Sequence, residues 1–305
     1  MIIFDIIESR QVAIRALGSL ILLCGLSSSP LLQAKDTLYW SMRDLPPLTI
    51  EDGRERGQGP IDRLLPLLMA ALPQYQHETL RMNRARTLQM LESDAFVCDP
   101  TMLWTEQRSR SILYSIPSLK VQSSGLVIRK ADLDRFKGFM TQGELDLHAL
   151  VTRSDIRLGV VSERSYGAWV DEQVRLTRAD HRVIHHGNTA IPSLLRMERL
   201  GRIDAVIAHW PEAHYHALQQ GIDLSTLSFL PVKGAARYQA FYVGCSNTPQ
   251  GRAAMPAINA VLRSMRSDKL VELYASWLEP DARVRYLEDA KTFFTGADDT
   301  GNASQ

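Results

Sequence analysis

Short apolar runs alternate with stretches of helical periodicity along most of this chain. The first run, 37–42 (TLYWSM), is followed by residues 60–72, where apolar side chains recur at the spacing of an amphipathic helix and Pro60 lies in the first turn. A second run, 77–82, and a short helical stretch, 85–91, repeat the order. Strand alternating with helix is typical of a doubly wound, mainly parallel sheet, so we expect an α/β fold.

The second part of the chain repeats this order and then returns to the first. A strand at 125–129 leads away from the first unit, and a strand at 156–161 is followed by a polar loop, 162–167, and a helix that runs through Val174. Further predicted elements are strands at 183–186 and 203–208, a helix from Asn188-Thr189 to Gly201, and a last helix at 270–278. The strand at 238–245 and the two helices after it are expected to pack on the first unit.

One stretch, FVCDPTMLWTEQRSRSILYSIP, carries the features of a ligand anchor. Its apolar run breaks at Asp99-Pro100, and the turn that follows carries Trp104 and Arg108. A strand that ends in a turn with an aromatic and an arginine is a common way to place a ligand anchor at a sheet edge. The alternative is an ordinary surface turn in which Arg108 forms a salt bridge with Glu106 or Asp99.

The N-terminus has the layout of a secretory signal. Arg10 and Arg15 precede a predominantly apolar segment, 16–26, which is followed by serines and small residues up to Ala34. The apolar segment is too short to span a bilayer comfortably. We therefore expect residues 1–34 to be a signal peptide, cleaved near Ala34 on export to the periplasm.

Removal of that peptide leaves two cysteines, Cys98 and Cys245. Two cysteines in an exported chain form one disulfide more often than two free thiols, so a bridge from an early strand to a late one is expected. The alternative is a pair of buried free cysteines.

Composition narrows the classes of function. The net charge of +1 comes from scattered residues, so the chain lacks the positive surface that nucleic acid or an acidic membrane requires. There is no G-x-S-x-G nucleophile motif, and His209, Glu212, His214 and His216 match no zinc-ligand spacing. We therefore expect no catalytic residue, metal or cofactor. Residues 289–305, which are small and polar after Phe294, are expected to be a disordered tail.

The order of these features resembles the family 3 extracellular solute-binding proteins, the binding components of ABC transporters. The segments that carry the resemblance are 40–48, 59–72, 105–108 (TEQR) with 115–117 (SIP), 159–167, 201–205 (GRIDA) and 238–251. The resemblance implies the periplasmic type II binding-protein fold. This is an α/β fold of two lobes, each a mostly parallel sheet flanked by helices, with two hinge crossovers between them.

The resemblance also implies where the lobes and the ligand contacts lie. Lobe I would be residues 35–122 and 238–288, with both Cys98 and Cys245, and lobe II residues 123–237. The family's T-x-x-R arginine clamps a ligand carboxylate, so this role falls to Arg108, whose planar guanidinium suits bidentate binding.

Two departures from the family pattern affect the expected ligand. Residues 102–104 (MLW) stand where amino-acid binders usually place Ser or Thr, and His209 stands where they tend to carry an acid for the ligand ammonium. The residues expected to bind the ligand are Trp40, Asp44, Trp104, Arg108, Arg164, Ser165, Tyr166 and His209. Two alternatives stay open: the tryptophans can belong to the core, and Ser165 and Tyr166 can simply cap the helix after them.

These observations favour a monomeric, non-enzymatic periplasmic protein that captures a small polar, carboxylate-bearing ligand between two lobes for an ABC importer. Its partners would be the ligand and a membrane permease, with no nucleic acid. One alternative is a sensory module that presents its ligand-bound form to a membrane receptor. A second is a dehydratase-like enzyme, which would need Glu163 or His209 as a proton donor.

Overall fold

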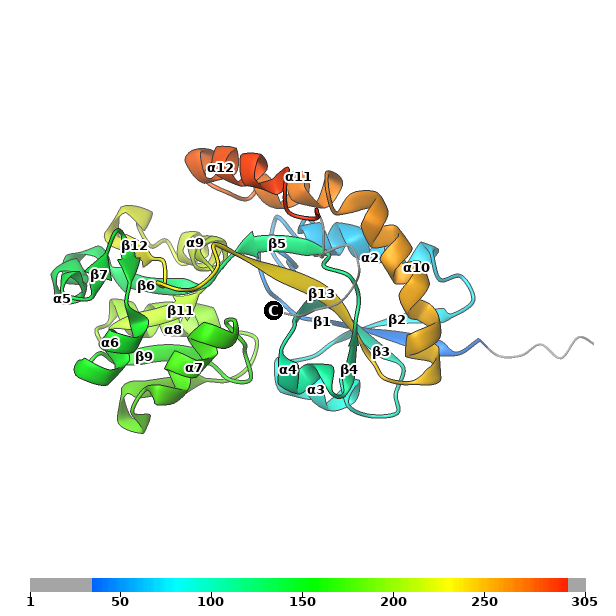
Figure 1. Ribbon diagram of the computed structural model, residues 1–305, viewed down its shortest axis with the longest axis horizontal. Helices are drawn as coiled ribbons and strands as arrows, with labels where there is room; N and C mark the ends of the chain where they lie inside the picture. Colours follow the sequence, from blue (N-terminus) through cyan, green and yellow to red (C-terminus); the bar gives the residue numbers. More distant parts are fainter. Residues whose placement is uncertain (1–34, 296–305) are drawn as a thin grey trace, which may run out of the picture. The chain divides into compact units, whose positions relative to one another are not determined.

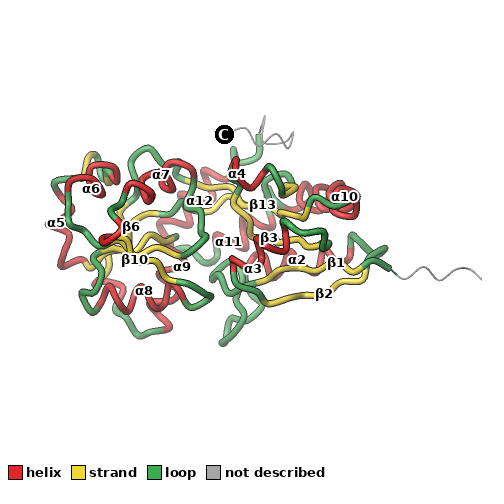
Figure 2. Tube along the Cα trace, turned by 90° about the horizontal axis from the view of Figure 1, so that it is seen from below, coloured by secondary structure: helices red, strands yellow, loops and turns green. Residues whose placement is uncertain are grey.

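Two β-sheets with helices on their faces organise the chain (Figure 1). The computed structural model describes residues 35–295, and those from Thr37 onward belong to one compact unit. The strands of the first sheet are β1 (Thr37–Met42), β2 (Gln76–Arg81), β3 (Val97–Leu103), β4 (Ile112–Tyr114), β5 (Leu119–Gln122) and β13 (Tyr238–Ser246). Their order is β2-β1-β3-β13-β4, with β5 also pairing β13. In Figure 2, β1 and β2 run side by side, as their parallel register requires.

The second sheet has the order β10-β9-β11-β6-β12. Its strands are β6 (Gly125–Arg129), β9 (Leu158–Val161), β10 (Arg182–His185), β11 (Ala205–Ala208) and β12 (Leu227–Leu230); a separate small hairpin joins β7 (Met140–Thr141) and β8 (Glu144–Leu145). Within the described residues, β13 of the first sheet and β6 of the second run against the other strands of their sheets. Each sheet is therefore mostly parallel, as the alternation of strand and helix predicts.

Helices cover both faces of each sheet. They are α2 (Pro60–Ala70), α3 (Arg84–Leu91), α4 (Glu106–Ser109), α5 (Leu133–Lys137), α6 (Leu147–Arg153), α7 (Ala168–Leu176), α8 (Ala190–Arg199), α9 (Trp210–Gln219), α10 (Pro249–Met265), α11 (Lys269–Ala275) and α12 (Pro280–Ala290). In the second sheet one core packs against α5, α6 and α7, and the other packs against α8 and α9 on the opposite face (Figure 2). The first sheet likewise has a large core under α2, α10 and α11 and a smaller one beside α3.

Two segments connect the sheets, one from β5 to β6 and one from β12 to β13. The first is the pair Ser123-Ser124, and the second ends at Arg237. The two segments run together, because the Ser123 backbone N–H donates to the Arg237 carbonyl at 2.9 Å and Gln122 pairs with Tyr238 in the sheet. These are the two crossovers expected of a two-lobe fold.

The expected disulfide is confirmed. Cys98 in β3 and Cys245 in β13 are direct partners across the antiparallel ladder, and their sulfur atoms are bonded. The bridge lies inside the largest core, with both residues fully buried.

The expected break in the third strand was wrong. The apolar run at residue 95 does not break at Asp99-Pro100, because β3 continues through both residues to Leu103. Pro100 is tolerated because it lies where the register with β13 shifts, between Tyr242 and Gly244. At this irregularity the ladder does not require the N–H that proline lacks.

The chain also stays folded further toward its C-terminus than expected. The helix at 270–278 is not the last, because α12 follows it, begins with proline in its first turn and runs through Ala290. Phe293 and Phe294 are then buried against the first core. The expected tail therefore does not begin at 289. The expected signal peptide and residues 296–305 lie outside the described residues.

Candidate functional site

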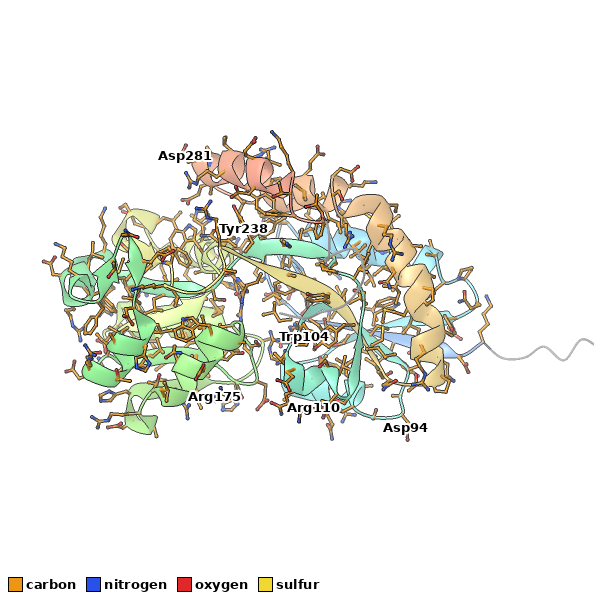
Figure 3. The ribbon with its side chains drawn as sticks, in the orientation of Figure 1. Asp94, Trp104, Arg110, Arg175, Tyr238 and Asp281 are labelled. Atoms are coloured by element: carbon orange, nitrogen blue, oxygen red, sulfur yellow. A yellow bond between two sulfur atoms is a disulfide. The ribbon has the colours of Figure 1, made fainter. Side chains whose placement is uncertain are left out.

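Loops that follow the strands of both sheets surround two neighbouring cavities. The small cavity has a volume of about 130 Å³ and is lined by Arg43, Asp44, Arg84, Arg164 and Glu212, among others. The large cavity has a volume of about 1430 Å³. Its lining includes Trp104, Arg110, Arg175 and Tyr238, which Figure 3 labels. Residues 161–164, the end of β9 and the loop after it, line both cavities.

A buried ion pair holds Arg43, which lines the small cavity. The Arg43 Nη1 donates to Asp99 Oδ2 at 2.5 Å, and its Nη2 donates to the Thr101 carbonyl at 3.1 Å. The other oxygen of Asp99 accepts from the backbone N–H and the hydroxyl of Thr101. Arg43 and Asp99 are 4% and 0% exposed, so this arrangement is held rigidly at the end of β1 and in β3. Asp99 is therefore the partner of Arg43, and the proposed salt bridge between Asp99 and Arg108 is absent.

Arg108 lies in the short helix α4 and reaches across to the second sheet. Thr105 caps this helix, and its hydroxyl accepts the Arg108 backbone N–H at 3.2 Å. The Arg108 guanidinium donates to the Leu103 carbonyl at 3.3 Å and to the Glu163 carbonyl at 2.9 Å. Glu106 pairs with Arg110 instead of Arg108. The Arg108 guanidinium is partly desolvated at the edge of the large cavity, and this burial lowers its pKa.

A second buried ion pair joins the loop after β9 to α9. The Arg164 guanidinium binds both oxygens of Glu212, at 3.0 and 2.5 Å, and the two side chains are 4% and 6% exposed. Burial alone would raise the pKa of Glu212, but the charge and hydrogen bonds of Arg164 hold it below the ordinary value. Both groups are therefore charged at neutral pH, and Arg164 faces both cavities with its charge compensated.

Ser165 and Tyr166 shape their own loop with their polar groups. The Ser165 hydroxyl donates to Asp171 at 2.6 Å, and the Tyr166 backbone N–H donates to the other oxygen of Asp171 at 2.7 Å. The Tyr166 hydroxyl accepts from the Val161 backbone N–H at 2.7 Å. Neither residue caps α7, whose N-cap is Gly167. Both residues line the large cavity, but the polar groups named above are already hydrogen-bonded within the protein.

Two of the expected ligand-binding residues lie outside both cavities. Trp40 is fully buried in the first core, and its indole N–H donates to His77 at 3.1 Å, so its assignment as a cleft wall is corrected to a core residue. His209 is 6% exposed, and its Nδ1 lies 2.8 Å from the Gln122 carbonyl beside the first crossover. Burial lowers the pKa of His209 to about 4, so the ring is neutral at pH 7.

The other expected residues border the cavities. Asp44 and Arg164 line the small cavity, and Trp104, Arg108, Arg164, Ser165 and Tyr166 line the large one. Asp44 accepts the Glu51 backbone N–H at 3.1 Å, and burial raises its pKa.

Sequence reasoning missed two arginines of the small cavity, Arg43 and Arg84. Both follow strands that are parallel neighbours, β1 and β2, so their positions at the carboxyl ends of adjacent strands were the available signal. Arg84 is the first residue of α3, after its cap Asn83. Within residues 35–295 no group of His, Cys, Asp and Glu is arranged to hold a metal ion, and no helix is long and apolar enough to cross a membrane.

No protein-family model and no curated protein matches the sequence, but solved structures match its fold. One is a histidine kinase sensor domain with similarity to periplasmic binding proteins, at 14% identity and a TM-score of 0.61 over 80% of this chain and 96% of that one. Another is the ancestral amino acid-binding protein AncCDT-1, a precursor of cyclohexadienyl dehydratase, at 15% identity and 0.57 over 80% and 96%.

A third is an amino acid ABC transporter substrate-binding protein from Streptococcus pneumoniae bound to L-arginine, at 16% identity and a TM-score of 0.54 over 85% of this chain and 94% of that one. These likenesses confirm the fold that the sequence resemblance implies. The chain has the two-lobe, type II periplasmic binding-protein fold of the family 3 solute-binding proteins.

Proposed function

We propose that this chain is an exported solute-binding protein that captures a small, carboxylate-bearing ligand between two lobes. Lobe I is residues 35–122 with 238–288, and lobe II is residues 123–237. The observation that carries the proposal is the pair of cavities lined from both sheets, with two fixed ion pairs and Arg108 at their borders. Concave sites with few, well-oriented charged groups are typical of small-molecule binding.

Arg108 is proposed to bind the ligand carboxylate. A guanidinium has five N–H donors, and the two carbonyl contacts to Leu103 and Glu163 leave others to face the large cavity. Trp104, four residues before it, lines the same cavity and offers an apolar surface for the rest of the ligand.

Closure of the lobes is proposed to follow ligand binding. The first crossover is short, and it is hydrogen-bonded to the second crossover where the two run side by side. A small rotation of the backbone at this place can separate the two sheets. A ligand that contacts both lobes only in the closed form shifts the population toward that form. In the described structure Arg108 already links the lobes through the Glu163 carbonyl.

The protein that receives the closed form is proposed to be an ABC permease, by likeness to the transporter-associated protein of S. pneumoniae. The likeness to a histidine kinase sensor domain supports a second candidate, a sensory module for a membrane receptor. A permease gene beside the coding gene would favour import, and a sensor gene would favour signalling. N-terminal sequencing of the periplasmic form tests export and is expected to find Lys35 as the first residue.

A thermal-shift screen tests the binding function. The panel should contain amino acids, small mono- and dicarboxylates, amines, sugars and peptides, with wild type beside Arg108→Ala. A ligand at a hundred times its dissociation constant adds about 2.7 kcal/mol to the free energy of unfolding, which is visible as a raised melting temperature. A carboxylate hit that weakens in Arg108→Ala is the expected result. Turnover of a hit to product, without any partner, would favour the dehydratase-like alternative, and no hit at all would contradict the binding function.

A further inference from the structure

Arg84 differs from Arg43 and Arg164, the other arginines that line the small cavity, in that its side chain has no hydrogen bond or ion pair among the described residues. Arg43 is paired with Asp99, Arg164 with Glu212, and Arg108 donates to two carbonyl groups. Within residues 35–295, the half-buried Arg84 side chain forms neither a hydrogen bond nor an ion pair, although it lines the small cavity.

The surroundings of Arg84 favour an anion. Burial lowers the pKa of Arg84 well below its ordinary value. The positive charges of Arg43, Arg164 and Arg108 lower this pKa further, and each does so more strongly than the carboxylate of Asp99 raises it. Three guanidinium groups therefore dominate the field at this side chain. Glu212, an acid that lines the same cavity, has its charge compensated by its bidentate pair with Arg164. A buried cation in such a field is stabilised by a negative partner, which the described chain does not supply.

A second group in the same cavity has an unused donor. Arg43 is 4% exposed, and its Nε is buried without a hydrogen-bond acceptor among the described residues, while its two Nη atoms are held by Asp99 and Thr101. Arg43 and Arg84 thus both line the small cavity, Arg43 directly after β1 and Arg84 at the start of α3. Arg84 also begins α3, a helix whose N-terminus favours negative charge.

The acids that also line the small cavity do not remove this preference. Asp44 is held by the Glu51 backbone N–H, and Glu163 is exposed. Neither is among the groups that act most strongly on Arg84.

We propose that Arg84 is a second anion-binding residue of the ligand site, so that the ligand is a small molecule with two acidic groups. This inference rests on the proposed binding function. One carboxylate binds Arg108 in the large cavity, and the second acidic group binds Arg84 in the small cavity. The volume of about 130 Å³ has room for a carboxylate or phosphate group.

The test compares ligands with one and two acidic groups on the purified full chain. Acetate and butyrate are the monocarboxylate probes, succinate and glutarate are the dicarboxylate probes, and phosphoglycolate tests whether the second group is a phosphate. The variants are Arg84→Met, Arg108→Ala and the matched control Arg86→Met. Arg86 lies exposed on the same helix, where its guanidinium donates to Gln89. Melting temperature and isothermal titration give the binding.

The expected result is that one of the dianions binds wild type and Arg86→Met at least tenfold more tightly than any monocarboxylate. Arg84→Met should abolish that advantage, whereas Arg108→Ala should weaken mono- and dianions alike. Without ligand, Arg84→Met should melt about 2–4 °C higher than wild type, because an unpaired cation has been removed.

The inference is overturned if the advantage of dianions persists in Arg84→Met, or if the only ligands found are neutral or carry one acidic group. A persisting advantage of dianions, or ligands with one acidic group, would leave the proposed function intact, whereas neutral ligands alone would also contradict its carboxylate. Failure of every anion of this series and of every compound of the thermal-shift panel would overturn the binding function and this inference together.

Discussion

The ion pair between Arg164 and Glu212 allows a direct test of how the site is held together. Glu212→Gln should lower the free energy of unfolding by about 3–5 kcal/mol, because it leaves the Arg164 guanidinium buried without a countercharge. The structure supports the upper part of this range, since the pair is bidentate and both side chains are at least 94% buried. A loss of this size is a large fraction of the 5–15 kcal/mol that is typical of a folded domain.

A double variant separates the charge from the packing. Arg164→Met with Glu212→Leu removes both charges and keeps apolar volume, so its stability should be close to that of wild type or higher. The matched control is Glu163→Gln, because Glu163 is exposed beside Arg164 and its change should stay within about 0.5 kcal/mol. Urea unfolding followed by tryptophan fluorescence measures all three variants.

The pH dependence gives an independent readout of the same pair. The pKa of Glu212 is lowered in the folded protein, so its contribution is complete above the unfolded value of about 4.3 and is lost as pH falls through the folded value. Glu212→Gln should therefore be most destabilising at pH 7 and approach wild type at pH 3. A loss below 1 kcal/mol at pH 7, or one that does not shrink in acid, would refute the assignment of a buried, charged pair.

Three further predictions concern other parts of the chain. Replacing Cys98 and Cys245 by alanine should cost about 2–5 kcal/mol in chemical unfolding, and wild type with reductant should behave like the variant; insensitivity to reductant would contradict a disulfide. Burial raises the pKa of Glu198 to about 7, so its stabilising contribution is complete below about pH 4.5 and is lost as pH rises through 7. Glu198→Gln should thus raise the melting temperature at pH 8 and leave it nearly unchanged at pH 4.5, and equal effects at both values would exclude this titration. Arg108→Ala removes the hydrogen bond to the Glu163 carbonyl and should increase the radius of gyration of the ligand-free protein in X-ray scattering, whereas an unchanged radius would show that other contacts keep the lobes closed.

Elements with strong local signals could be predicted from the sequence. The strands at 37–42 and 125–129 coincide with β1 and β6, because a short apolar run between turn residues leaves few alternatives. The pairing of Cys98 with Cys245 also needed only their number and the expectation that the chain is exported. These features depend on neighbours along the chain or on residue counts, which the sequence displays directly.

Features that depend on tertiary register could not be predicted. Pro100 continues a buried strand only because the β13 register shifts beside it, a fact about a partner more than 140 positions away. The Arg43–Asp99 pair joins residues 56 positions apart, and nothing local distinguishes it from a pair between Asp99 and Arg108. From the sequence, Trp40 near the end of a strand could belong either to the cleft or to the core. It is a core residue because it belongs to the same buried cluster as residues of α2 and α10.

The arginines of the site show why residue type alone does not assign a binding role. A T-x-x-R match directs attention to Arg108, yet this side chain is already held by two carbonyl groups. Arg43 and Arg164 are more deeply buried, but each has a carboxylate within 2.5 Å and serves first as a fixed part of the wall. Arg84 has no motif around it, and among the arginines that line the small cavity it is the one whose charge the described residues leave uncompensated. A ligand gains most from the interaction that the protein has not already made, so the affinity for acidic groups should depend on Arg84 at least as strongly as on Arg108.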